Sequence, residues 1–265
     1  MTPPSVERGI PLRAVVPNAV TALALCSGLT AIRFAIAGLW ENAIYAIIIA
    51  AVLDGMDGRI ARALKGQSKF GAELDSLSDV IAFGVAPALI LYLWALQYWP
   101  RFGWLFCLAY AVCMALRLAR FNSRIDAEEQ PHKSAGFLTG VPAPAGAGLM
   151  LVPIYLWLAS DRSWSWLLDY RVVAPWAALI AFLSISNLAT FTWTSFRLRR
   201  NVRVQAIGAI ALLGGALFSA PWETLTATAL LYILLIPFSV ASYGRIRRQR
   251  ADAAQRAAAP AEPTG

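Results

Sequence analysis

Four aspartates in one short stretch of this 265-residue chain have the types and spacing of a reactive site. The stretch runs from residue 54 to residue 79 and reads DGMDGRIARALKGQSKFGAELDSLSD. Asp54 and Asp57 are three residues apart, and Asp75 and Asp79 are four apart, so each pair shares one face of a helix. Two antiparallel helices joined by a short loop can bring these two acidic faces together.

Converging carboxylates repel one another unless cations lie between them. Because the group contains oxygen ligands and no His or Cys, it favours hard divalent ions such as Mg²⁺ or Mn²⁺ over zinc. We therefore expect a divalent metal site formed by Asp54, Asp57, Asp75 and Asp79.

Small and basic residues accompany the acids. Gly58 and Ala61 continue the face of Asp54, and Gly71 precedes Asp75 by one helical turn. Such residues allow a nucleotide to approach the backbone, and Arg62 can bind phosphate oxygens. This combination favours phosphoryl transfer. Acids within apolar segments also occur in interhelical contacts and in ion or proton paths, so a cation-coupled transporter is an alternative.

The elements that must position these residues are membrane helices. Hydrophobic residues make up 58% of the chain and charged residues 14%, against about 25% charged in soluble domains. The apolar residues form continuous runs near the length of about 20 residues that a crossing helix needs, and they do not alternate as in barrel strands. We expect an all-α integral membrane protein with about eight spans, at 14–37, 42–60, 72–96, 102–120, 143–160, 172–192, 204–220 and 222–243.

The net charge of +8 points to a membrane surface rather than to nucleic acid. All but four of the 23 Lys and Arg residues fall on one side of an eight-span arrangement; the exceptions are Arg33, Arg101, Arg162 and Arg171. The positive-inside rule then places both termini, and the acidic stretch, on the cytoplasmic side of the membrane. The basic rim also suits anionic lipid headgroups.

The acidic stretch resembles the signature of CDP-alcohol phosphotransferases, D-x2-D-G-x2-A-R-x8-G-x3-D-x3-D, at all eight fixed positions. The resemblance implies a homodimer whose core of six helices surrounds a polar cavity open to the cytoplasm. It also implies that Asp54, Asp57 and Asp75 bind two divalent ions, with Asp79 assisting a metal or taking the proton of the acceptor hydroxyl. Gly58, Ala61, Arg62 and Gly71 would contact the CDP group.

Beyond this signature the chain is similar to membrane-embedded phosphatidylserine synthases of the same family. The similarity lies in the first 145 residues, in Pro17-Asn18 with Thr21, in residues 70–77 with Phe83-Gly84 and Pro87, and in residues 117–122 and 140–145. It implies transfer of a phosphatidyl group from CDP-diacylglycerol to the hydroxyl of L-serine. Glycerol 3-phosphate, inositol phosphate or choline are alternative acceptors. The last two spans carry no recognisable motif.

A serine acceptor brings a carboxylate that needs a cationic partner. Arg117 and Arg120 are three residues apart at the cytoplasmic end of one span, and Asn122 follows them. We expect one or both arginines to bind this carboxylate, with Asn122 nearby. Basic residues at such a helix end also anchor topology, which is the alternative interpretation.

These expectations divide the chain into four regions of an inner-membrane protein with its active site facing the cytoplasm. They are a cytoplasmic segment 1–13, a catalytic core 14–192, two further helices within 204–243, and a basic tail 244–265. Asp79 and Asp75 are the expected catalytic residues.

Overall fold

The structure, a computed structural model, describes residues 12–123, 137–186, 189–191 and 203–238. Within these residues, helical segments lie in each of the eight places where the sequence predicts a span, although residues 239–243 of the last one are outside the described range. The expected tail 244–265 lies outside the described residues. The helical elements are α1 (Leu12–Ile36), α2 (Trp40–Ala63), α3 (Lys69–Asp79), α4 (Ala86–Trp94), α5 (Gly103–Ser123), α7 (Ala143–Met150), α8 (Val152–Ala159), α9 (Tyr170–Ile185), α10 (Arg203–Ser219) and a last helix, Pro221–Phe238.

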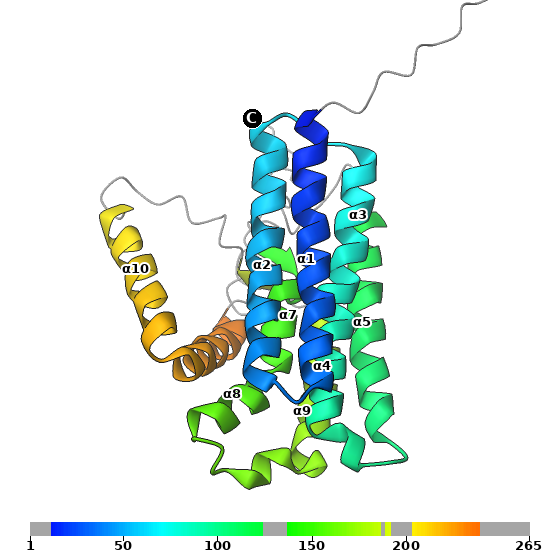
Figure 1. Cartoon of the computed structure of the whole chain (residues 1–265), viewed down its shortest axis with the longest axis vertical. Coiled ribbons are helices and arrows are strands. Elements are labelled where there is room, and N and C mark those ends of the chain that lie inside the picture. The colour runs from blue at the N-terminus through cyan, green and yellow to red at the C-terminus, as the bar shows by residue number, and fades with distance from the viewer. Residues whose placement is uncertain (1–11, 124–136, 187–188, 192–202, 239–265) are drawn as a thin grey trace, which may run out of the picture.

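The bundle is built from antiparallel neighbours. Figure 1 shows α1, α2 and the rod containing α3 and α4 side by side, with the α1–α2 turn at the lower end and the α2–α3 loop at the upper end. The acidic stretch spans that upper loop, so the two acidic helix faces lie at the same end of the bundle. This is the hairpin that the spacing of the aspartates predicts.

Small residues let α1 approach its neighbours closely. Ala31 and Ala35 on α1, and Ala43 and Ala50 on α2, are buried in one apolar cluster. Gly28 lies directly against the rod behind it, since a Cβ at this position would come within 2.7 Å of the Ala82 Cα. Close packing of small residues is the usual way in which membrane helices associate.

The rod that follows the α2–α3 loop contains a π-helical turn directly after its acids. This turn covers Val80–Val85 and joins α3 to α4 in one continuous helical rod, Lys69–Trp94. Tyr110 on α5 is fully buried, and its hydroxyl donates a hydrogen bond of 3.0 Å to the Phe83 carbonyl within the turn. Single π turns often occur at functional sites, and here the turn changes the helical register just beyond Asp79.

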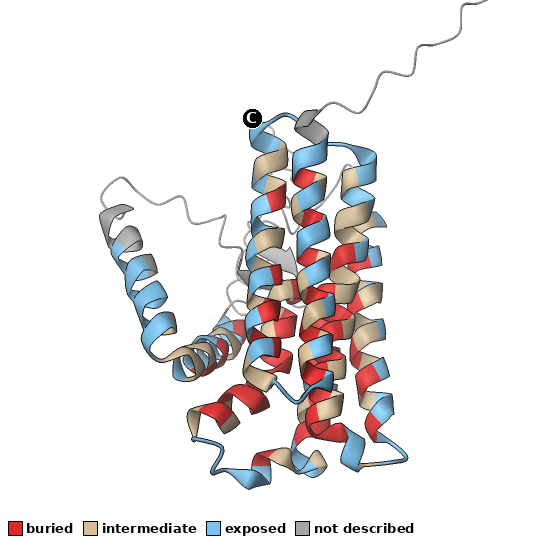
Figure 2. Ribbon diagram, in the orientation of Figure 1, coloured by how far each residue is buried: buried red, intermediate tan, exposed pale blue. Residues whose placement is uncertain are grey.

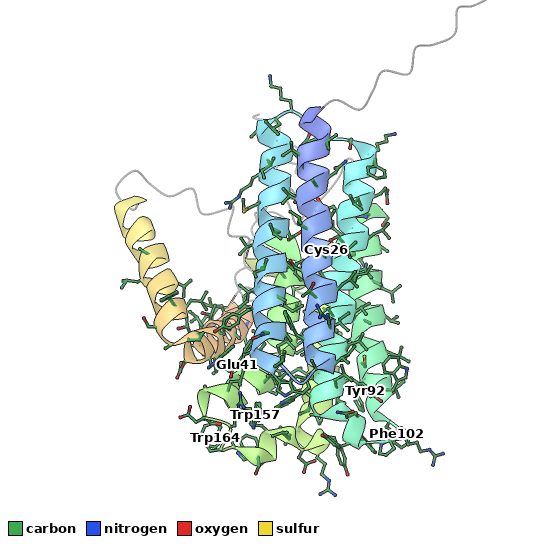
Figure 3. All side chains as sticks on the ribbon, in the orientation of Figure 1. Cys26, Glu41, Tyr92, Phe102, Trp157 and Trp164 are labelled. Atoms are coloured by element: carbon green, nitrogen blue, oxygen red, sulfur yellow. The ribbon has the colours of Figure 1, made fainter. Side chains whose placement is uncertain are left out.

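The two ends of the bundle differ in packing. In Figure 2, buried residues gather in the lower half, whereas the upper ends of α1, α2 and α3 are mostly exposed or intermediate. Aromatic side chains mark the lower end, where Figure 3 labels Tyr92, Phe102, Trp157 and Trp164. The tightly packed half is therefore the one remote from the acids.

Two departures from the expected helices concern the segments after residue 123. The span expected at 143–160 is two short helices, because the helix breaks at Leu151 and Pro153 follows at the start of α8. The span expected at 172–192 ends at Ile185, because Ser186 is extended. Strand β2 (Ala189–Phe191) then pairs antiparallel with β1 (Phe137–Thr139), so the described chain is helical apart from this short ribbon.

Within the described parts of the chain, four helices are long and apolar enough to cross a membrane. They are Val15–Ile36, Lys69–Trp94, Gly103–Ser123 and Pro221–Phe238. Helix α2 is as long as these, with 24 residues, but it carries five charged residues. The last helix packs onto the bundle: the ring centroids of its Trp222 and of Tyr45 on α2 are 5.3 Å apart.

Candidate metal and substrate site

The acids of α2 and α3 converge as their spacing predicts. Asp54, Asp57 and Asp75 each offer a carboxylate oxygen, and these oxygens all lie within 4.8 Å of one another. Asp79, at the end of α3, shares a side-chain hydrogen bond with Asp54. All four aspartates of the stretch therefore belong to one cluster formed by two helices.

Local sequence explains the tight loop that brings these helices together. At the end of α2, the Gly66 N–H bonds to the Ala61 carbonyl at 2.9 Å, and Lys65 adopts a left-handed φ of 50°. Helix α3 then begins with Ser68 as its N-cap, whose Oγ accepts from the Gly71 N–H at 3.0 Å. A C-terminal turn followed at once by an N-cap reverses the chain within a few residues.

Asp57 is the most deeply placed of the acids, with 5% of its surface exposed. Thr21 on α1 donates a hydrogen bond of 2.6 Å from its Oγ1 to Asp57 Oδ2. Ser78 on α3 in turn donates to the Thr21 carbonyl at 3.3 Å. Neither Thr21 nor Ser78 had a predicted role at the site; Thr21 was one of the residues that carry the family resemblance, and for Ser78 the sequence offered only a hydroxyl beside the acids.

The residues expected to contact CDP lie beside the acids, on the last turns of α2 and the first turn of α3. The side chain of Arg62 runs back along α2, since its Nη1 lies 3.5 Å from where a Cβ of Gly58 would be. Gly71 also has a packing reason to be glycine: a Cβ there would come within 2.7 Å of Asn18 Oδ1 and 3.1 Å of Ser68 Oγ. Ala61 is half-buried on the same part of α2.

The three residues expected to bind the acceptor carboxylate are placed differently from one another. Arg117 is partly buried on α5 within electrostatic range of Asp79, and its Nε is buried without a hydrogen-bond partner. Arg120 donates from Nη1 to the Ile185 carbonyl at 3.0 Å, and Asn122 donates from Nδ2 to Ser76 Oγ at 2.7 Å. Arg117 therefore lies within electrostatic range of the acids, whereas Arg120 holds the backbone at the end of α9.

The composition of the acidic cluster fits a hard divalent ion. It offers three carboxylate oxygens from Asp54, Asp57 and Asp75 and no sulfur or imidazole, which is the ligand chemistry of Mg²⁺ and Mn²⁺ rather than of zinc. The adjacent guanidinium of Arg117 and the exposed Arg62 supply further positive charge for phosphate or carboxylate groups.

Comparison with known families agrees with this geometry. Residues 14–183 match the model of the CDP-alcohol phosphatidyltransferase family. The chain belongs to this family. Residues 203–237 match a second model, CDP-alcohol phosphatidyltransferase 2, so the C-terminal helices in which the sequence analysis recognised no motif also resemble the family.

Relatives of the family with assigned names cover most of the chain. It is 38% identical over 242 residues to the CDP-diacylglycerol–serine O-phosphatidyltransferase of Mycobacterium tuberculosis, which is 90% of this chain and 82% of that protein. It is 31% identical over 219 residues to the protein of the same name from Helicobacter pylori, covering 82% of this chain and 87% of the relative. The resemblance found from the motifs is thus confirmed.

From this cluster we expect the protein to bind Mn²⁺ in the absence of substrate, with an affinity that depends on Asp57. In protein purified into nanodiscs, Asp57→Asn should weaken Mn²⁺ binding by about a hundredfold or more, because a buried anionic ligand is lost. The measurement is titration of free Mn²⁺ by electron paramagnetic resonance. Glu73→Gln, on the exposed side of α3, is the matched control and should bind as the unchanged protein does. Equal affinity of the Asp57 variant and the control would contradict the assigned metal site.

Proposed function

We propose that this chain transfers the phosphatidyl group of CDP-diacylglycerol to the hydroxyl of L-serine, giving phosphatidylserine and CMP. The observation that carries the proposal is the convergence of the signature aspartates on α2 and α3, within a chain of this family. The names of its relatives support serine as the acceptor.

The proposed reaction is a direct displacement at the phosphorus that carries the diacylglycerol. Asp79 receives the proton of the serine hydroxyl, whose oxygen forms a bond to this phosphorus as the bond to the CMP oxygen breaks. Divalent ions, proposed to be two and held by Asp54, Asp57 and Asp75 with help from Asp79, would neutralise charge on the pyrophosphate and on the departing CMP. Arg62 binds phosphate oxygens, the small residues Gly58 and Ala61 leave room for the nucleotide, and Gly71, whose Cβ position is taken by Asn18 and Ser68, contacts it through its backbone.

Serine itself is proposed to be oriented by Arg117. Arg117 lies within electrostatic range of Asp79, so a serine whose carboxylate is bound to Arg117 would have its hydroxyl near the proposed proton acceptor. Arg120 and Asn122 support the surrounding backbone and side chains through Ile185 and Ser76. Their part is to hold α5 against α9 and α3 rather than to contact serine.

We further propose that the chain is a multi-pass protein of the inner membrane with eight crossings, formed by a six-helix core and the two C-terminal helices. Both termini, and the acidic end of the bundle, face the cytoplasm because that end carries the basic clusters. The resemblance to the family supports a homodimer, which light scattering of the purified protein measures.

The proposed reaction predicts release of CMP that depends on both serine and a divalent ion. With labelled CDP-diacylglycerol in nanodiscs, serine should support turnover at least about a hundredfold faster than glycerol 3-phosphate, inositol phosphate or choline. A chelator should stop the reaction, and added Mn²⁺ or Mg²⁺ should restore it. The alternative of a transporter predicts cation flux in proteoliposomes and no CMP. Turnover with another acceptor in place of serine would assign that acceptor instead.

Arg117 should affect serine and not the lipid donor. Arg117→Gln is expected to raise the KM for serine by about 10- to 100-fold, because a charge-assisted hydrogen bond is lost, while the KM for CDP-diacylglycerol stays within about twofold. Steady-state kinetics with each substrate varied in turn provide the measurement. Arg59→Gln, on an exposed face of α2, is the control. A matching rise in both KM values would indicate general damage and contradict the assignment.

The proposed orientation can be measured by cysteine labelling in intact cells. After replacement of Cys26, Cys107 and Cys113, one cysteine is introduced at Ser163, between α8 and α9, or at Gln67, between α2 and α3. A membrane-impermeant maleimide should label Ser163→Cys from outside and should reach Gln67→Cys only after permeabilisation. The reverse pattern would overturn the orientation.

A further inference from the structure

Helix α1 contributes none of the signature residues, yet it places a buried hydroxyl against the acids. Among the described residues, five polar side chains are buried, and three of them are Thr21, Asp57 and Ser78. These three form one chain of hydrogen bonds that runs from α2 through α1 to α3. A polar chain of this kind within an apolar bundle indicates a specific role, because each of its members is costly to bury alone.

The Thr21 hydroxyl donates its hydrogen bond to Asp57 rather than to the backbone. Two acceptors lie near Thr21 Oγ1: the Asp57 carboxylate at 2.6 Å, and the Pro17 carbonyl, one turn back in α1, at 3.2 Å. A hydroxyl has one proton, and the shorter contact is to the charged acceptor, where hydrogen bonds are stronger. The Pro17 carbonyl is also an acceptor in the helix ladder, so it does not depend on this proton.

The bond to Thr21 orients the carboxylate of Asp57. It engages Oδ2, so the carboxylate is held by one oxygen while Oδ1 makes no bond to Thr21 and is available to a cation. The carbonyl of the same threonine accepts from Ser78, one residue before Asp79, so Thr21 is tied to both acid-bearing helices at the level of the acids. Partners of this kind restrict the rotation of a metal ligand and raise the affinity of its site.

We propose that Thr21 is a positioning residue for the divalent metal site, holding Asp57 through Oγ1 and α3 through its carbonyl. The inference rests on the proposed function, in that it takes Asp54, Asp57 and Asp75 as metal ligands. It adds a residue from a third helix, so the affinity of the site for metal depends on how α1 packs against α2 and α3.

The test compares Mn²⁺ affinities of purified full-length variants in nanodiscs, without substrate, by electron paramagnetic resonance. Thr21→Val removes the hydroxyl at nearly constant shape and should weaken Mn²⁺ binding by about tenfold or more. Thr21→Ser restores the hydroxyl and should bind within about threefold of the unchanged protein. Thr30→Val is the matched control: Thr30 is also on α1 and donates to the carbonyl four residues back, that of Cys26, without reaching an acid.

Each outcome supports or overturns the inference. Unchanged Mn²⁺ affinity of Thr21→Val overturns it, as does equal weakening in Thr21→Val and Thr30→Val. If the valine variant does not fold, the smaller Thr21→Ala takes its place, and Ser78→Ala, which releases α3 from the Thr21 carbonyl, should weaken Mn²⁺ binding to a lesser degree. Absence of Mn²⁺ binding in the unchanged protein would overturn the proposed metal site itself, which separates that failure from a failure of Thr21 alone.

Discussion

The structure depends on one electrostatic constraint: three carboxylates are held together inside an apolar bundle. Two unit charges at 4.8 Å, the upper limit of the distances between these oxygens, repel by about 3.5 kcal/mol at an effective dielectric constant of about 20, and Asp54, Asp57 and Asp75 form three such pairs. Their sum, about 10 kcal/mol, is as large as the whole stability of a typical domain. The fold can keep these side chains ionised together only when positive charge enters the cluster. That positive charge can be protons or a divalent cation, and the oxygen ligands of the cluster suit a divalent cation such as Mg²⁺ or Mn²⁺.

The buried packing and the acidic cluster lie in different halves of the bundle. The half remote from the acids is filled by small residues and by aromatic side chains, and at its border with the acidic half Gly28 lets α1 contact the backbone of Ala82. The π turn of Val80–Val85 lies between the two halves, and the Tyr110 hydroxyl holds its Phe83 carbonyl. Helix α1 connects both parts, because its inner residues pack against α2 while Thr21 reaches Asp57. The buried half thus holds together the helices that carry the acids at their other ends.

Much of this arrangement could be predicted from the sequence, because it follows from helical periodicity. The three- and four-residue spacing of the aspartates predicted two acidic faces, and the short loop from α2 to α3 brings them together as expected. Periodicity could not reveal which helix lies behind the acids, so Thr21 had no predicted role. Nor could it separate Arg117 from Arg120. Side chains three residues apart point about 60° apart around a helix; Arg120 donates to the Ile185 carbonyl, and Arg117 lies within electrostatic range of Asp79. The early end of α9 depends on pairing between β1 and β2, which joins segments distant in the chain.

The position of Arg117 also bears on the choice of acceptor. Serine is a zwitterion and adds no net charge to the acidic cluster, so one guanidinium beside Asp79 suffices for its carboxylate. A phosphorylated acceptor would bring up to two more negative charges toward the same aspartates and would require additional cations around it. Among the described residues, Arg120 already donates to a backbone carbonyl and Arg62 is exposed at the end of α2. The charge that the bundle offers close to Asp79 therefore matches an amino acid better than a sugar phosphate.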